Sequence, residues 1–210
     1  ASDVYKRQLF AQRAKQTQRE FSLQRERTHV VRICHLVDGM PLALELAATW
    51  LRTLPASDIA DELERNLDLL TSQHRNVSER HRSMRVVFEQ AWRYLDAREQ
   101  RSLAHLSIFR GGFQRDAAAE VAGTSLPTLA SLLDKSVVRR SDERYHLHEL
   151  TRQFAVEKLE ERGETKQIQD AHAIYYLSLL ADYDDALRGG DPANTFRLLR
   201  VELDNLRLAW

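Results

Sequence analysis

Cysteine is nearly absent from this chain, since Cys34 is the only one in 210 residues. A single thiol can form neither an intramolecular disulfide nor a cysteine zinc site, so we expect a reducing, cytoplasmic setting. Long apolar runs are also missing. No stretch approaches the roughly 18 residues of a membrane-spanning helix, and we therefore expect no membrane partner.

An excess of charge of either sign is absent as well. The 31 basic residues balance the 31 acidic ones, whereas a dedicated nucleic-acid binder normally carries a basic excess. Hydrophobic residues make up 43% and charged residues 30%, an ordinary globular balance. The length suits one medium domain or two small ones.

The seven glycines include no phosphate-binding loop, because none begins a Gly-x-x-x-x-Gly-Lys-Ser/Thr motif. No apolar strand that ends in aspartates offers a Walker B metal ligand either. Phosphate binding of this kind needs the N–H groups of the glycine-rich loop and its lysine. We therefore expect this chain alone neither to bind ATP well nor to hydrolyse it, and we assign it no catalytic residue.

The apolar periodicity predicts a mainly α fold, with a helical bundle, a winged helix with a short β-hairpin, and an antiparallel helix pair. The predicted helices cover residues of about 25–37, 41–54, 57–70, 84–95, 96–109, 115–122, 125–133, 149–162, 166–188 and 192–210, and the hairpin about 136–148. Several local signals set the ends of these elements: Asp38-Gly39 as a stop, Pro41 in a first turn, Ser57 as a cap, Asp96 with Glu99 as a capping box, and Gly123 as a stop. A polar linker is expected at 71–79.

The stretch YHLHEL places His146 and His148 at the junction of a strand and a helix, with Glu149 next. Two histidines at i and i+2 share one strand face, but a zinc site needs three or four ligands and no further ligand is identifiable. No nucleophile can be placed near a catalytic His-Glu pair. For His146, a half-buried polar strand end is the simplest alternative.

His148 has a stronger case as an anion contact. It precedes a predicted helix, whose first-turn N–H groups and dipole favour negative charge. A protonated imidazole would add charge and a directional donor, and Glu149 would favour that protonation.

DNA binding is the alternative that a winged helix suggests. The predicted recognition helix, SLPTLASLLDKS at 125–136, has no arginine, asparagine or glutamine to read base edges. The wing offers Arg139, Arg140 and Arg144, opposed by acidic neighbours. Direct DNA binding is therefore not favoured. A helical scaffold without a nucleotide role is a third reading.

Three segments together carry a family resemblance: GMPLALELAA (39–48), SLLDKSVVRR (131–140) and YHLHELTRQFAVEKLEERGE (145–164). The chain resembles the signal transduction ATPases with numerous domains (STAND), in their NB-ARC or AP-ATPase branch, and especially bacterial transcription regulators of that branch. The resemblance runs from about Leu9 to the end, where LDNLRLAW is typical of the start of C-terminal helical repeats.

The resemblance implies that the chain is a piece of a longer protein with four parts. Residues 1–19 would be the tail of a nucleotide-binding domain, 20–75 a small helical domain, 79–164 the winged-helix domain and 165–210 the start of TPR-like repeats. Implied partners are a P-loop domain of the same polypeptide, a protein or small-molecule inducer bound by the repeats, and further copies in an active oligomer.

The resemblance also implies a nucleotide site. In such proteins the Gly-x-Pro proline lies near adenine, here Pro41 with Gly39, and the histidine of a Met-His-Asp motif reaches the β-phosphate of ADP. That motif reads Leu147-His148-Glu149 here, so the histidine is kept while both neighbours differ. ADP or ATP with magnesium is expected in the full-length protein, a slow ATPase, and no cofactor for this chain alone.

Overall fold

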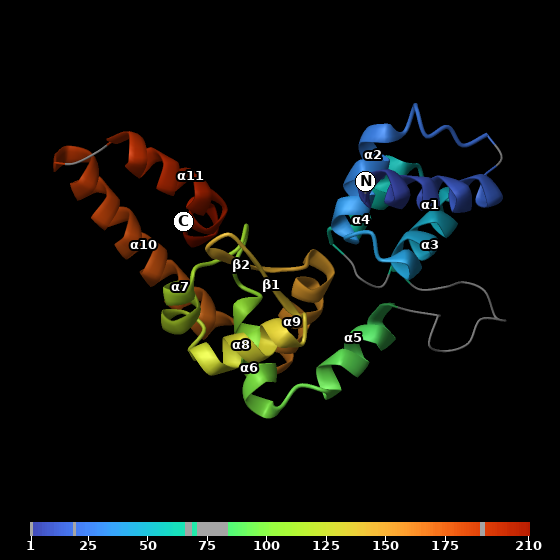
Figure 1. Ribbon diagram of the computed structural model, residues 1–210. Coiled ribbons are helices and arrows are strands. Elements are labelled where there is room, and N and C mark those ends of the chain that lie inside the picture. Colours follow the sequence, from blue (N-terminus) through green and yellow to red (C-terminus); the bar gives the residue numbers. More distant parts are fainter. Residues whose placement is uncertain (1, 19, 66–68, 71–83, 190–191) are drawn as a thin grey trace. The chain divides into compact units, whose positions relative to one another are not determined.

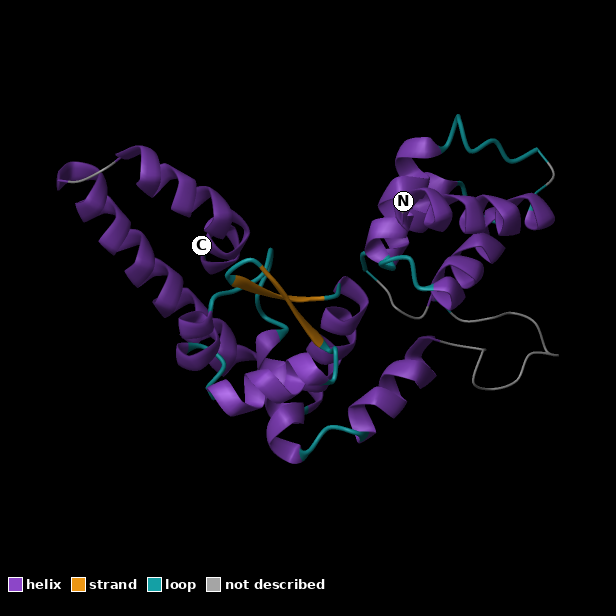
Figure 2. Ribbon diagram, in the orientation of Figure 1, coloured by secondary structure: helices purple, strands orange, loops and turns teal. Residues whose placement is uncertain are grey.

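The computed structural model describes residues 2–18, 20–65, 69–70, 84–189 and 192–210 (Figure 1). The chain divides into two compact units, the first formed by Ala1–Tyr94 with His148–Phe154 and the second by Leu95–Leu147 with Ala155–Trp210. The linker predicted at 71–79 lies outside the described residues. The fold is mainly α, as predicted, with one short hairpin (Figure 2).

The first unit is an arrangement of short helices. They are α1 (Ser2–Thr17), α2 (Arg27–Leu36), α3 (Pro41–Thr49), the 3-10 helix η1 (Trp50–Arg52), α4 (Ala56–Leu63) and α5 (Met84–Arg93). Helix α1 packs on α3, and α2 packs on α4. The exposed pair Arg13–Glu45, at 3.0 Å, adds a polar contact between α1 and α3.

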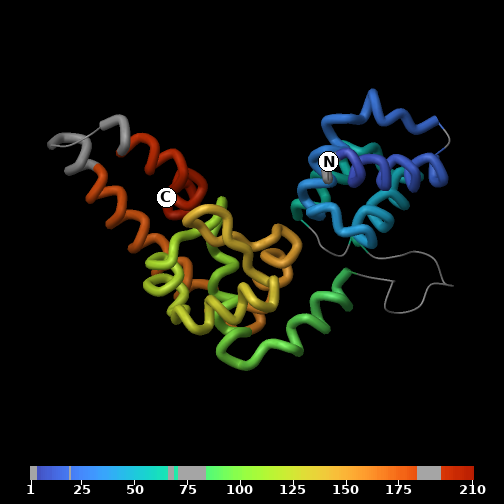
Figure 3. The backbone as a smooth tube through the Cα atoms, viewed as in Figure 1, coloured from blue at the N-terminus to red at the C-terminus, as the bar shows by residue number. Residues whose placement is uncertain are grey.

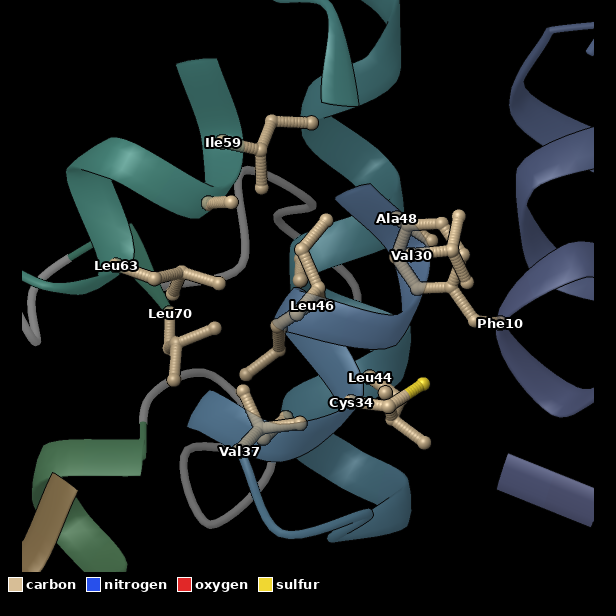
Figure 4. Close-up of a cluster of buried hydrophobic side chains, with 14 of the residues drawn as sticks. Phe10, Val30, Cys34, Val37, Leu44, Leu46, Ala48, Ile59, Leu63 and Leu70 are labelled. Atoms are coloured by element: carbon tan, nitrogen blue, oxygen red, sulfur yellow. The ribbon is translucent and has the colours of Figure 1, made fainter. Parts of the chain in front are cut away.

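The core of the first unit is a continuous apolar cluster (Figure 4). Helix α3 contributes on several sides, as its nearly all-apolar sequence predicts, with Ala43, Leu44, Leu46, Ala47 and Ala48 buried. Helix α1 contributes Phe10, Ala11 and Ala14, and the Phe10 ring meets Phe21 edge to face at 6.0 Å. The sequence analysis did not predict α1, because its apolar stripe is narrow.

One predicted cap is wrong. Helix α4 begins at Ala56, with extended Pro55 at the N-cap position and no side-chain cap. Ser57 lies inside the helix, where its hydroxyl donates to the Asp58 carboxylate at 2.9 Å. The proline, whose fixed φ suits an extended residue, lets the helix begin earlier than the serine suggested. The helix also ends at Leu63, before the predicted residue 70.

The second unit has the element order of a winged helix. Its elements are α6 (Ala97–Leu106), α7 (Arg115–Glu120), α8 (Leu126–Asp134), β1 (Val138–Ser141) and β2 (Arg144–Leu147), followed by the second half of α9 (Glu149–Glu161) and by α10 (Thr165–Gly189) and α11 (Pro192–Ala209). The antiparallel hairpin pairs Val138 with Leu147 and Ser141 with Arg144. An isolated bridge between Phe113 and Tyr145 adds a strand position between α6 and α7.

Glu99 connects the winged-helix elements. The predicted capping box is confirmed, since the Asp96 side chain accepts from the N–H groups of Arg98 and Glu99, and Glu99 accepts from the Asp96 N–H. The buried Glu99 carboxylate also accepts from Ser131, within α8, at 2.5 Å and from Lys135, just after α8, at 2.6 Å. These bonds, that of Lys135 first, lower the pKa of Glu99 from 4.5 to about 2.

Helices α10 and α11 lie side by side as an antiparallel pair, drawn in orange and red (Figure 3). The sequence Gly189-Gly190-Asp191-Pro192 predicts a break between the two helices, and its residues 190 and 191 lie outside the described residues. Tyr176 of α10 is buried and meets Phe109 at a ring distance of 6.3 Å. Within the described ranges, no helix combines the length and apolar character that crossing a membrane requires.

Candidate functional site

The turn between α2 and α3 carries two of the predicted site residues. Asp38 and Gly39 both have positive φ, at 48° and 68°, and the Gly39 N–H donates to the Cys34 carbonyl at 2.9 Å. This is the helix stop that Asp38-Gly39 predicted. A Cβ atom on Gly39 would overlap the Lys6 side chain, so glycine lets the lysine of α1 lie across the turn.

Pro41 follows at the first position of α3 and is exposed. Met40 precedes it as the N-cap residue without a side-chain cap bond, so no side chain from that position covers the first-turn N–H groups. The Lys6 ammonium lies 3.8 Å from the Asp38 carboxylate. The exposed Pro41 ring thus follows a turn that the Lys6 side chain of α1 crosses at Gly39.

His148 is the N-cap residue of α9. Its carbonyl accepts from the Arg152 N–H at 2.8 Å, and its ring Nδ1 accepts from the Leu150 N–H at 3.1 Å. An imidazole nitrogen that accepts carries no proton, so the proton of the neutral ring is on Nε2. The capping bond therefore fixes the tautomer and makes Nε2–H the donor.

The carboxylate of Glu149 binds two side chains of the next helical turn. It accepts from Arg152 at 2.7 Å and 3.0 Å and from the Gln153 amide at 3.2 Å. A doubly protonated His148 ring would give up the cap bond, because both its nitrogens would then be donors. In the cap bond Nδ1 is the acceptor, and the protonated imidazole suggested by the sequence would have to break that bond.

The first turns of α9 are anchored in the core of the first unit. The Gln153 amide donates to the carbonyls of Leu63 and Glu64, at 2.8 Å and 3.1 Å, at the end of α4. Leu150 is fully buried, and the Phe154 ring stacks on Phe88 at 5.8 Å. The two turns of α9 that follow His148 are therefore held by buried contacts.

The surroundings of His146 indicate a role in packing. Its ring lies against Gly112, where a Cβ atom would approach the imidazole to 2.5 Å. Burial, and then the charge of Arg144, lower the pKa of His146. Among the residues that the structure describes, no group of three His, Cys, Asp or Glu could hold a metal ion. The metal reading of the two histidines therefore has no support in the geometry.

The structure places the predicted site residues at two positions of the first unit. Gly39 and Pro41 share the α2–α3 turn, while His148 begins α9. The sequence analysis did not find Lys6, which precedes the turn by more than thirty residues. It also missed the buried pair Arg152 and Gln153, because polar residues in a helix give no sequence signal for burial.

The surface of the predicted recognition helix α8 is apolar or acidic. Its outward residues are Leu126, which is 57% exposed, Pro127, Ala130 and Asp134. Lys135 is bonded to Glu99. On the wing, Arg144 is not available to a phosphate backbone, since its guanidinium is bound to Glu202.

Comparisons with known proteins find relatives in mycobacteria. A Mycobacterium tuberculosis (strain H37Rv) protein that is named provisionally as an HTH-type transcriptional regulator is 33% identical over an alignment of 215 positions, which covers 97% of this chain and 24% of the relative. A protein of Mycobacterium bovis with the same kind of name matches equally. An uncharacterised protein of the H37Rv strain is 30% identical over an alignment of 196 positions, which covers 87% of this chain and 49% of the relative.

The chain thus spans about a quarter to a half of the length of the curated relatives that it matches. No protein-family model matches it. Among solved structures, a STAND protein with a tetratricopeptide repeat sensor from Pyrococcus horikoshii aligns with a TM-score of 0.43 and 20% identity, over 93% of this chain and 28% of the other. The chain is similar to part of a protein named as a bacterial regulator.

Proposed function

We propose that this chain is the regulatory part of a STAND-type nucleotide switch that acts in bacterial transcription regulation. The motif resemblance around Gly39–Pro41 and Leu147–Glu149 supports the nucleotide switch. The mycobacterial relative that is named as a transcriptional regulator supports the biological setting. The P-loop that such a switch requires is assigned to another part of the parent polypeptide, together with its magnesium and its slow ATPase activity.

One observation carries the proposal: the Nδ1 atom of His148 is occupied as an acceptor from the Leu150 N–H. The neutral ring therefore has its donor at Nε2, which is the atom able to bind a phosphate oxygen. A hydrogen bond from a ring held by its own helix cap loses little side-chain entropy on binding. His148 is in this way prepared for an anion without needing to be protonated.

The remaining residues fit a nucleotide in complementary ways. Exposed Pro41 offers an apolar face to a base, and Gly39 allows the backbone of the turn to stay close to Lys6. Bound ADP would supply the negative charge and the base that these groups recognise. The protein contributes the orientation of the His148 donor and the rigidity of α9, which Gln153 ties to the end of α4.

The geometry does not favour direct DNA binding by this part of the protein. Exposed Leu126, Pro127 and Ala130 on α8 supply no hydrogen-bonding group for a base edge, and Asp134 adds a negative charge that the phosphates would repel. We expect no salt-dependent shift of duplex DNA by the 210-residue chain in an electrophoretic assay at physiological salt. A shift that weakens steeply as salt rises would instead support the DNA-binding alternative.

The test of the nucleotide role compares two substitutions of His148 in the intact parent protein. His148→Ala removes both the Nε2 donor and the helix cap, whereas His148→Asn keeps a capping oxygen but has no group that reaches as far. Each preparation is purified in the same way, and its retained ADP is quantified after denaturation. The release of bound fluorescent ADP gives the rate.

Both variants are expected to release ADP roughly tenfold to a hundredfold faster, as the loss of a hydrogen bond to a charged group implies. The melting temperature of His148→Asn should stay near that of the unmodified protein. Normal ADP release in His148→Asn, with fast release only in His148→Ala, would mean that His148 is just a cap. Normal release in both would refute the nucleotide contact.

A further inference from the structure

Helix α11 is joined to the hairpin by a buried polar network in the second unit. The Arg144 guanidinium donates to both carboxylate oxygens of Glu202 and, at 2.9 Å, to the Gly112 carbonyl. The Asn205 amide donates to the same Gly112 carbonyl at 2.9 Å and accepts from the Arg110 N–H at 2.7 Å. Figure 1 shows the C-terminal end of α11 beside the hairpin.

The network is almost closed to solvent. Glu202 is 4% exposed and Asn205 is fully buried, while the Arg144 side chain is 13% exposed. The charged Glu202 carboxylate also contributes, after burial, to raising the pKa of Tyr176 on α10. A buried ion pair of this kind adds little net stability compared with apolar packing, but removing one partner leaves the other charge uncompensated. The arrangement is therefore stable only when both charged partners are in place. We call the contact of Arg144 with Glu202 and Asn205 the joint.

One residue of the joint, Arg144, lies four residues before His148 in the chain. Arg144 begins β2, which ends at Leu147, and His148 follows as the N-cap of α9. Strand β2 is also held by two bonds between Tyr145 and Phe113, at 2.8 Å and 2.9 Å. No loop residue separates the end of this strand from the helix cap, so a shift of β2 is passed along the backbone to the His148 ring.

We propose that the contact of Arg144 with Glu202 and Asn205 is the coupling through which the C-terminal helices control His148. With the ion pair closed, β2 is fixed and His148 is held as the cap of α9. A rearrangement of α11 opens the pair, releases β2 and disturbs the ring. This regulation rests on the proposed nucleotide contact of His148. It names the residues that would pass a signal from the C-terminal helices to that contact.

The coupling can be measured first in the 210-residue chain, by hydrogen exchange of the segment 144–152. Glu202→Gln keeps the side-chain volume but removes the charge that Arg144 needs, and Arg144→Lys is a milder second variant that loses the bond to Gly112. Asp170→Asn, which breaks the exposed Lys166–Asp170 pair of α10, is the matched control. We expect exchange of the segment to quicken roughly fivefold or more in the two joint variants and not in the control.

The second readout is ADP release in the intact parent protein. Glu202→Gln should quicken release when His148 is present and should add little in a His148→Asn background, because both changes act on one contact. Equal effects in both backgrounds would overturn coupling through His148, as would unchanged exchange of the segment in both joint variants.

The two readouts separate this inference from the proposed function. If exchange quickens in the joint variants but His148→Asn releases ADP normally, the nucleotide contact is refuted, and with it the control of ADP by the joint. If His148→Asn releases ADP quickly while Glu202→Gln and Arg144→Lys leave the hydrogen exchange of the segment 144–152 unchanged, the nucleotide contact stands and the coupling is refuted.

Discussion

The buried carboxylate of Glu99 offers a direct test of how the winged-helix elements are held together. Its pKa of about 2, against 4.5 for an ordinary glutamate, means that the charged form is stabilised by at most about 3 kcal/mol. Since the Lys135 side chain is 38% exposed, solvent screening reduces this contribution to about 1–2 kcal/mol. Glu99→Gln should lower the free energy of unfolding by that amount at pH 7.

The pH dependence gives the sign of the effect. A carboxyl group with a lowered pKa in the folded state stabilises it above the unfolded pKa of 4.5, and the contribution is lost as the pH falls towards 2. The difference between the unmodified chain and Glu99→Gln should therefore be constant near neutrality and shrink below pH 4.5.

Urea unfolding followed by circular dichroism, repeated from pH 7 to pH 3, measures this difference. Glu161→Gln provides the control, because Glu161 is 62% exposed in its pair with Lys158 and should change stability by less than about 0.5 kcal/mol. An equal stability of Glu99→Gln and the unmodified chain at pH 7 would refute the reasoning. A gap that stays the same down to pH 3 would also do so.

Two further comparisons of variants probe packing and backbone conformation. Phe154→Ala removes the ring that stacks on Phe88 and should lower the free energy of unfolding by about 3–5 kcal/mol, measured by thermal unfolding. Phe154→Leu should recover a large part of that stability. Equal melting temperatures of the unmodified chain and both variants would contradict the packing. Gly112→Ala should be more destabilising than Gly123→Ala, since both have positive φ but only the Cβ atom at 112 meets the His146 ring. Equal unfolding midpoints in urea would count against that contact.

Much of the fold follows from local signals in the sequence. The Asp96–Glu99 capping box and the stop at Asp38-Gly39 are each decided within a few residues, and the structure confirms both. The hairpin was readable for the same reason. Helix α1 was not, because its sequence is largely polar and, of the side chains described, only Phe10 and two alanines are buried. Its position depends on α3, which no local pattern reveals.

The candidate site was also only partly predictable, because local sequence signals locate its residues but do not give their contacts. His148 could be singled out from its place between a strand and a helix, but its tautomer depends on a bond to Leu150 that only coordinates supply. The adjacent Glu149 was expected to act on the histidine, whereas Arg152 and Gln153 one turn later bind its carboxylate. Competition among neighbouring donors is a property of three-dimensional packing, and sequence spacing alone could not decide it.

The packing of α1 has a practical consequence for dissecting this protein. The resemblance suggests a boundary near residue 20, and a shortened chain that starts there keeps every residue of the small helical domain so defined. Such a chain would lose the Phe10 ring, the alanines that α1 packs on α3, and the Arg13–Glu45 contact. The apolar face of α3 that packs against α1 would then be exposed to water, which favours aggregation during expression. A stable excised domain has to begin ahead of α1.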